Sequence, residues 1–247
     1  MNFFKVKLST IFITIMMAIT SLPINLVFAQ EFNNDDALTK TIDDIVISIE
    51  KESDDYLNDA HLLVNNLSKE EKDEVNKLIY SLNDTNKNIV YSYAYDISLL
   101  DKDDNDYQLD QSVNLSFLLP AIDENLNVAL YHIHEDEVNL LDIEVEENVI
   151  KTNIDSFSYF VVELSYEDLN YTFDQDSITL QQLLLAVGLK GEASEVVFSD
   201  NDIFTLIETL GEETIFINQD FENEEWIKVI INNIEYQINV KKNNKIT

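Results

Sequence analysis

The stretch that decides the fold is NVALYHIHEDEVNLLDIEVEENVIKTNIDSFSYFVVEL, residues 127–164. Apolar side chains recur in it at every second position, as Phe160 and Val162 do near its end. Alternation at period two is typical of a strand with one face in a core. Polar breaks of hairpin length, at 135–137 and 147–148, divide the stretch. It therefore predicts four short strands in succession.

Alternation also predicts strands on the N-terminal side of this stretch. Residues 45–50 form the first of them, after a loose segment at 30–41. A second begins at Asn88 and carries tyrosine and aliphatic side chains on one face, and a third covers residues 113–119. Together with the quoted stretch this gives about seven strands, enough for two sheets packed as a sandwich.

Two helices are predicted between the first two strands. Ser53 can cap one that runs to Val64. Ser68 and Glu71 have the spacing of a capping box, in which each side chain satisfies an amide that the helix leaves unpaired. Apolar residues then recur at helical spacing and form one stripe: Val75, Leu78, Ile79 and Leu82. We expect this helical pair to cover one end or face of the sheet.

A smaller module is predicted after the sandwich. A polar connector at 165–176 leads to Thr179, which can cap a short helix over 180–187 that ends at Gly188. Five strands follow, and the last two meet at Asn232-Asn233, a residue type that tolerates the positive φ of a two-residue loop. The predicted strands cover 196–199, 203–208, 214–217, 226–231 and 234–240.

The fold class predicted from these patterns is mainly β with α+β elements. An antiparallel β-sandwich with a helical pair covers residues 42–165, and a small domain of one helix and about five strands covers residues 166–241. Residues 242–247 form a tail.

The first 29 residues have the order of a secretory signal peptide. Two lysines precede a long apolar run, which ends in the small residue Ala29, so we predict cleavage after residue 29. The run is about long enough to span a bilayer, which makes a membrane anchor the alternative. Pro23 and Asn25 interrupt the run just before the cleavage-like site and favour the signal peptide.

The chain is strongly acidic. It has 48 acidic and 15 basic residues, all 15 of them lysine, and a formal net charge of −33. Nucleic-acid binding depends on cations that neutralise phosphates, and anionic membranes attract basic segments, so the charge argues against both partners. The same charge makes cationic partners or Ca²⁺ candidates. Cysteine is absent, so folding rests on burial without disulfides.

Several of these segments resemble a module that recurs in Gram-positive surface and secreted proteins. They are YDISLLDKDDND (95–106), FLLP (117–120), ALYHIHEDE (129–137) and DSFSYFVVEL (155–164). Residues 177–240, with SITLQQLLLAVGL at their start, resemble the small domain that often follows in such proteins. The resemblance implies an extracellular β-sandwich with a structural or adhesive role. Its motifs consist of strand and turn residues, so it implies no catalytic residue.

His132 and His134 lie two residues apart on a predicted strand. Both then point to one face and could present two imidazoles to Zn²⁺, with Glu135 or Asp136 supplying a carboxylate. The third histidine, His61, lies on a distant predicted helix. The favoured interpretation is a pair of exposed strand positions. The residues expected to face the core are then Ala129, Tyr131 and Ile133.

An acidic turn has the one-residue gaps of a calcium loop, at Asp101, Asp103 and Asn105. An EF-hand needs Gly at the sixth position and Glu at the twelfth, where this chain has Asp106 and Ser112. The pattern therefore argues against an EF-hand. A solvated hairpin turn is the favoured interpretation, and an irregular, weak Ca²⁺ site over Asp101–Asp106 is the alternative.

The tyrosines Tyr91, Tyr93 and Tyr95 share one strand face. Flat aromatic faces suit sugar rings, so this stripe is a candidate glycan platform. Tyrosines at strand spacing more often pack on a sheet or in a core, and packing is the favoured interpretation.

The sequence favours a protein without enzymatic activity. It has no cysteine, no Gly-x-Ser-x-Gly elbow and no glycine-rich phosphate loop. We assign no catalytic, cofactor or metal residue and expect an exported, monomeric structural or interaction protein, with an extracellular protein or a glycan as partner. Two alternatives stay open: a glycan- or Ca²⁺-dependent ligand-binding module, and a metal-dependent enzyme that uses His132 and His134.

Overall fold

The computed structural model describes residues 37–51, 57, 59–82, 87–134, 137–221 and 224–243. The predicted signal peptide and the carboxylates of Glu135 and Asp136 lie outside these residues. In the described part of the chain, no helix combines the length and the apolar character that crossing a membrane requires.

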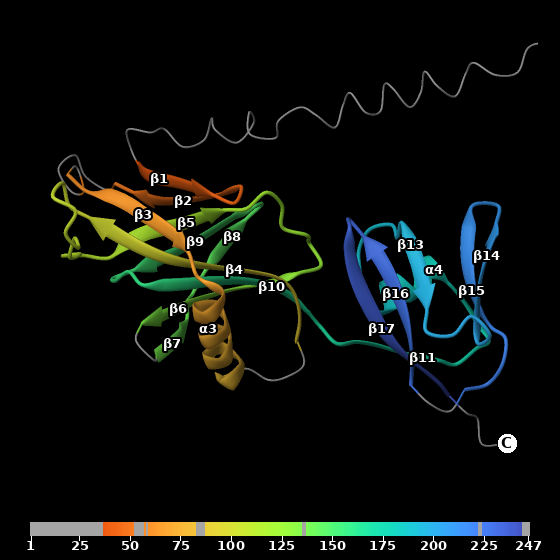
Figure 1. Cartoon of the computed structure of the whole chain (residues 1–247). Coiled ribbons are helices and arrows are strands. Elements are labelled where there is room, and N and C mark those ends of the chain that lie inside the picture. The colour runs from red at the N-terminus through yellow and green to blue at the C-terminus, as the bar shows by residue number, and fades with distance from the viewer. Residues whose placement is uncertain are drawn as a thin grey trace, which may run out of the picture.

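Two five-stranded sheets form the larger part of the molecule (Figure 1). Their strands are β1 (Ala37–Ile42), β2 (Ile45–Glu50), β3 (His61–Asn66), β4 (Lys87–Leu100), β5 (Val113–Leu118), β6 (Asn127–His134), β7 (Glu137–Leu140), β8 (Glu144–Glu146), β9 (Val149–Ile154) and β10 (Tyr159–Glu167). The first sheet has the order β1-β2-β5-β9-β8 and the second β3-β4-β10-β6-β7. Every pairing in both sheets is antiparallel. The mainly β, antiparallel fold class is therefore confirmed.

The two sheets enclose one hydrophobic core, and we refer to β1–β10 with their covering helix as the sandwich. Phe117 of the first sheet and Phe160 of the second are both 0% exposed, and their ring centroids lie 6.4 Å apart. Alternation brings Ile45, Ile47 and Ile49 of β2 into the same core. Burial of this kind contributes about 25 cal/mol per Å² of apolar surface, so the inward faces are the main source of stability.

Strand β1 lies where the sequence predicted a loose segment, so that prediction is wrong for residues 37–41. The strand pairs along its whole length with β2. Its side chains are mostly exposed, with Ala37 as the one buried position. An edge strand held by backbone hydrogen bonds needs no apolar alternation, so its sequence gave no periodic pattern to detect.

The helix α3 (Lys69–Leu82) covers the outer face of the second sheet. Its capping box is confirmed, because the Ser68 amide donates to Glu71 Oε2 at 2.8 Å and the Glu71 amide donates to Ser68 Oγ at 3.2 Å. Val75 and Ile79 of the predicted stripe are buried against the sheet. The helix stands against β6 and β10 in Figure 1.

The first helix of the predicted pair is wrong in its described part. Residues 61–66 form β3, which pairs with β4 through Leu62 opposite Leu99 and Val64 opposite Ile97. Leu62 and Val64 are buried whereas Leu63 between them is exposed. This short alternation at period two outweighed helix propensity, because β4 offers an open edge at the same place.

The remaining strands and one helix form a second unit, which we call the C-terminal module. Its elements are β11 (Leu169–Phe173), β12 (Ser177–Thr179), α4 (Leu180–Ala186), β13 (Glu195–Phe198), β14 (Phe204–Thr209), β15 (Glu212–Ile217), β16 (Glu225–Ile231) and β17 (Ile234–Lys242). They form two sheets, ordered β11-β17-β16-β13 and β12-β15-β14. The boundary predicted between the two domains stays a prediction.

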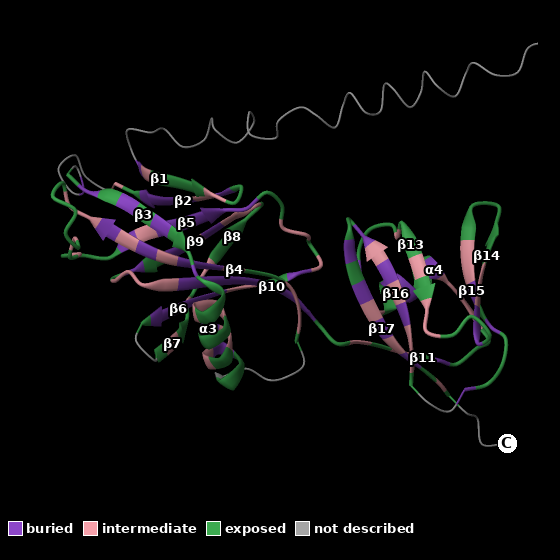
Figure 2. Cartoon of the chain, viewed as in Figure 1, coloured by how far each residue is buried: buried purple, intermediate pink, exposed green. Residues whose placement is uncertain are grey.

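Most of the C-terminal module follows its sequence pattern. Thr179 caps α4 in a capping box with Gln182, and Gly188 follows the helix with a φ of 81°. Asn232 and Asn233 both have positive φ, as the two-residue loop requires. The connector predicted at 165–176 is wrong, because β10 continues to Glu167 and β11 then pairs in parallel with β17. Figure 2 shows the buried strand faces of both units.

Candidate functional site

The two faces of β6 are exchanged relative to the prediction. His132 is 6% exposed and lies inside the sandwich, where its ring stacks on Phe160 with centroids 4.5 Å apart and planes at 13°. His134 is exposed at the end of the strand, and the two imidazole centroids lie 6.5 Å apart. The prediction of two exposed histidines is therefore wrong for His132.

The residues expected in the sandwich core lie on the opposite face of β6. Tyr131 and Ile133 are buried under α3, in a second small core that includes Val75 and Ile79, and Ala129 packs at its border. Both faces of this strand are covered, so alternation alone could not tell which face met the other sheet.

His132 has a serine neighbour that the sequence did not reveal. Ser158 Oγ lies 2.9 Å from His132 Nε2 and donates its single proton to the Ile133 carbonyl at 2.5 Å. Because a hydroxyl has one proton to donate, His132 Nε2 is the donor in the contact between them. A general base needs the reverse arrangement, with an unprotonated nitrogen facing the serine. In this arrangement the pair contributes packing and a hydrogen bond inside the sandwich.

A metal centre at the histidines lacks further ligands in the described part of the chain. No group of three His, Asp or Glu side chains there could hold an ion. Burial, with a smaller effect of the neighbouring His134, lowers the pKa of His132. The neutral imidazole is thus the favoured form of this side chain in the core.

The acidic turn closes on its own carboxylate. Asp101 Oδ1 accepts hydrogen bonds from the amides of Asp103 at 2.8 Å and Asn105 at 2.9 Å. The Asn105 amide, followed by its side chain and the Asp103 amide, holds the pKa of Asp101 below its ordinary value. Asp104 faces His61 at 3.3 Å. The aspartate therefore acts as a turn-closing acceptor, as the interpretation of a solvated turn requires.

The tyrosine stripe divides into a buried and an exposed part. Tyr95 is 1% exposed and belongs to the sandwich core. Tyr93 is half-buried, and Tyr91 is 42% exposed. The rings of Tyr91 and Tyr93 are nearly parallel, with planes at 17° and centroids 6.1 Å apart. The stripe thus packs at one end and presents aromatic surface at the other.

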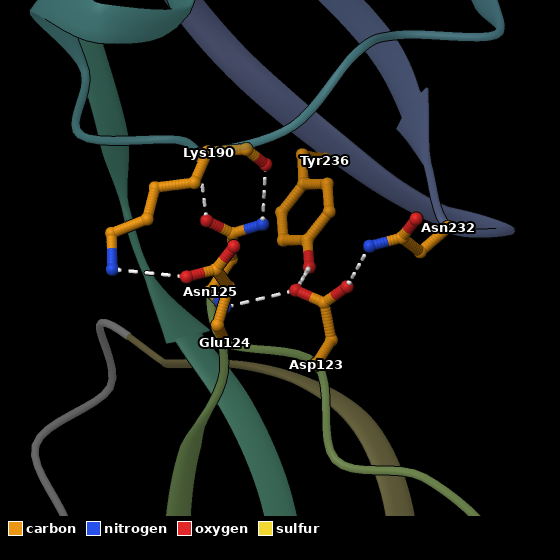
Figure 3. Close-up of polar contacts among 6 residues, drawn as sticks. All are labelled: Asp123, Glu124, Asn125, Lys190, Asn232 and Tyr236. Carbon is orange, nitrogen blue, oxygen red and sulfur yellow. Dashed lines mark hydrogen bonds and ion pairs between the residues drawn. The ribbon is translucent and has the colours of Figure 1, made fainter.

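A polar cluster that was not predicted from the sequence lies between the sandwich and the C-terminal module (Figure 3). We call it the joint, and it consists of Asp123, Glu124, Asn125, Lys190, Asn232 and Tyr236. The first three lie in the loop between β5 and β6, whereas the others lie after α4, in the β16–β17 turn and on β17.

Asp123 is the centre of the joint. Its Oδ1 accepts from the Asn125 amide at 2.9 Å and from Tyr236 Oη at 3.1 Å, and its Oδ2 accepts from Asn232 Nδ2 at 2.7 Å. Burial by itself raises the pKa of Asp123, but the hydrogen bonds from Asn232, Asn125 and Tyr236 outweigh it and leave the pKa below its ordinary value. The ionised carboxylate is thus the form that the joint selects.

Asn125 completes the joint by pairing with backbone. Its Nδ2 donates to the Lys190 carbonyl at 2.9 Å, and its Oδ1 accepts from the Lys190 amide at 2.8 Å. Lys190 Nζ also pairs with Glu124 at 3.1 Å across exposed surface. Near the joint, Tyr166 of β10 packs on Tyr236 with ring centroids 5.0 Å apart and accepts from the Gln237 amide at 3.2 Å. These contacts attach the module to the sandwich.

Comparisons with models of known protein families, with curated proteins and with solved structures found no match to this chain.

Proposed function

We propose that this chain is an exported, non-enzymatic structural or interaction protein of a Gram-positive cell surface or its surroundings, with adhesion as its kind of task. It would consist of a β-sandwich followed by a small α+β domain. One observation carries the proposal: the side chains best suited to catalysis or ion binding take part in packing, turn closure and the contacts of the joint. His132 stacks on Phe160, Asp101 closes its own turn, and Asp123 holds the joint.

Export and the acidic surface support the same role. The order of charge, apolar run and small residue over residues 1–29 is that of a signal peptide. A net charge of −33 keeps such a chain soluble and selects cationic partners. It also disfavours nucleic acid and anionic membranes.

The test is the fate of the full chain in a Gram-positive host. We expect the protein in the medium or on the cell wall, with Gln30 as its first residue by N-terminal sequencing. Ala29→Asp places a charge at the predicted cleavage site and should block processing. Cytoplasmic protein that still begins at Met1 would refute export, and uncleaved protein in the membrane would establish the anchor instead.

A glycan-binding role is the second candidate, and the exposed, nearly parallel rings of Tyr91 and Tyr93 favour it. Flat aromatic faces offer the apolar contact on which sugar rings stack. A glycan array with and without Ca²⁺ tests this role. We expect Tyr91→Ala to abolish a true signal and Tyr80→Ala, at a tyrosine that is 57% exposed on α3, to leave it unchanged. Equal loss in both variants, or no bound glycan, would remove this candidate.

A further inference from the structure

Strand β14 is an open edge of the C-terminal module. In its sheet it pairs with β15 alone, and it lies on the side of the module away from the sandwich (Figure 1). A two-residue turn, Leu210-Gly211, joins the strands with φ of 55° and 83°. The pair that flanks such a turn exchanges both backbone hydrogen bonds, and such pairs then recur at every second residue. The amides of Leu206 and Glu208 therefore point to the open edge.

This edge has little of the usual protection against another strand. Proteins shield edges with charged side chains, above all lysine, and with proline, bulges or very short strands. The six residues of β14 include neither lysine nor proline, their register with β15 has no shift, and Glu208 is their one charged side chain. Ile207 is 46% exposed and Phe216 of β15 is 38% exposed on the same outer face.

The other described edges are less open. Strands β1 and β3 lie against each other where the two sheets of the sandwich meet. The terminal strands β7, β8, β11, β12 and β13 are each three to five residues long, shorter than the six of β14. Apart from β1 and β3, β14 is therefore the longest terminal strand in the four described sheets.

Charge at this edge indicates what it accepts. Glu208 and Glu213 lie directly opposite each other, an unfavourable arrangement for like charges, and Glu212 follows on the same hairpin. None of these three carboxylates has an ion pair within the described residues. The described lysines of the last two strands already pair elsewhere: Lys228 with Glu235, Lys241 with Glu224, and Lys242 with Asp176 and Asp220.

We propose that the β14 edge binds an extended, lysine-bearing segment of a partner protein as an additional strand. Because side chains alternate along a strand, apolar residues of the segment would lie beside Ile207 while its lysines reach Glu208 and Glu213 from the other face. A second copy of this chain would bring its own Glu208 and a charge of −33, so repulsion disfavours self-pairing. This inference rests on the proposed interaction role and names the surface and the class of partner.

The probe is a synthetic peptide of alternating valine and lysine, blocked at both ends and titrated into the purified chain followed by NMR. We expect amide shifts centred on Leu206 and Glu208, and an affinity that falls as salt rises. The triple variant Glu208→Gln/Glu212→Gln/Glu213→Gln should weaken binding at least about tenfold. The matched triple variant Glu137→Gln/Glu144→Gln/Glu192→Gln changes net charge equally at exposed positions elsewhere and should cost about twofold or less.

A second variant, Glu208→Pro, tests the strand edge itself, with Glu208→Gln as the control that removes the same charge and keeps the backbone amide. Glu208→Pro removes an edge amide without removing a bond to β15, so the hairpin should persist while peptide binding is lost. Shifts elsewhere, or equal affinity in both triple variants, would overturn the proposal. A dimer in sedimentation that Glu208→Pro dissociates would also overturn it, in favour of a second copy. These outcomes are independent of export, so a secreted chain that fails here leaves the proposed function standing.

Discussion

Replacing Asp123 with alanine should loosen the C-terminal module from the sandwich. The carboxylate accepts three hydrogen bonds, from the Asn125 amide, Tyr236 Oη and Asn232 Nδ2. Two of these donors belong to β17 and the β16–β17 turn, so the substitution removes direct polar contacts between the two units. The substitution also removes the acceptor of the Tyr236 hydroxyl, and Tyr236 is 0% exposed.

The expected cost follows from those bonds. A hydrogen bond to a charged group contributes about 1.5–3 kcal/mol when buried, and a typical neutral one about 0.5–1.5 kcal/mol. Asp123 is half-buried, so solvent screens part of each contact. We therefore expect the free energy of unfolding to fall by about 2–4 kcal/mol. Asp103→Ala, at an exposed aspartate on the far turn, should change it by about 0.5 kcal/mol or less.

Urea unfolding with two probes measures the effect. Trp226 is the one tryptophan of the chain and reports on the C-terminal module by fluorescence, whereas far-ultraviolet circular dichroism follows both units. The two transitions should coincide in the parent chain and separate in Asp123→Ala, because coupling makes the units unfold together. Small-angle scattering should show a larger radius of gyration in the variant.

Acid provides an internal check. The pKa of Asp123 is lowered in the folded state, so its stabilising contribution is present above the ordinary aspartate pKa of about 3.9 and is lost as pH falls through the folded value. Asp123→Ala should therefore flatten the acid limb of stability against pH. Unchanged unfolding energy together with unchanged scattering would refute the role of the joint.

Three further predictions follow from the core. Phe117→Ala, at a side chain that is 0% exposed, should lower stability by about 3–5 kcal/mol in urea unfolding, whereas Leu140→Ala, at 66% exposure, should change it little. Burial lowers the pKa of His132, so stability should decline as pH falls from about 6.5 through the folded value; His132→Gln should flatten this slope, and an unchanged slope would contradict it. Burial raises the pKa of Glu163, which is 2% exposed, so its contribution to the stability of the fold is lost as pH rises through the pKa of the folded state. Glu163→Gln should therefore be more stable than the parent at pH about 7. Equal stability of the two chains at every pH would contradict this.

Long alternation and local caps could be predicted from the sequence. The strand over 45–50 has its predicted bounds, and five strands of the C-terminal module lie within a few residues of theirs. The predicted capping box at Ser68 and the predicted cap at Thr179 both formed, because a cap depends on residues three apart in sequence. These features are decided by neighbours along the chain.

Features decided by distant neighbours could not be predicted. Residues 61–66 are too few for the spacing of their apolar side chains to distinguish a strand from a helix. Their pairing with β4 determines that they form a strand. The joint connects Asp123 with partners 109 and 113 residues away, Asn232 and Tyr236. A single aspartate in an acidic chain carries no sign of such a contact.

The inverted face of β6 shows why a histidine in a strand cannot be assigned from polarity alone. The sequence offers His132 and Tyr131 as neighbours, and a histidine is the obvious choice for the solvent side. In this sheet neither side is solvent, since the opposite sheet covers one face and α3 the other. The choice then depends on which side provides each group with a partner. Phe160 offers a flat ring and Ser158 a hydroxyl to His132 on the sandwich side, whereas Glu163 accepts from Tyr131 on the helix side. Exchanging the faces would leave an imidazole and a phenol without these partners at a cost of about 1–3 kcal/mol for each buried group, which is enough to determine the orientation of the strand.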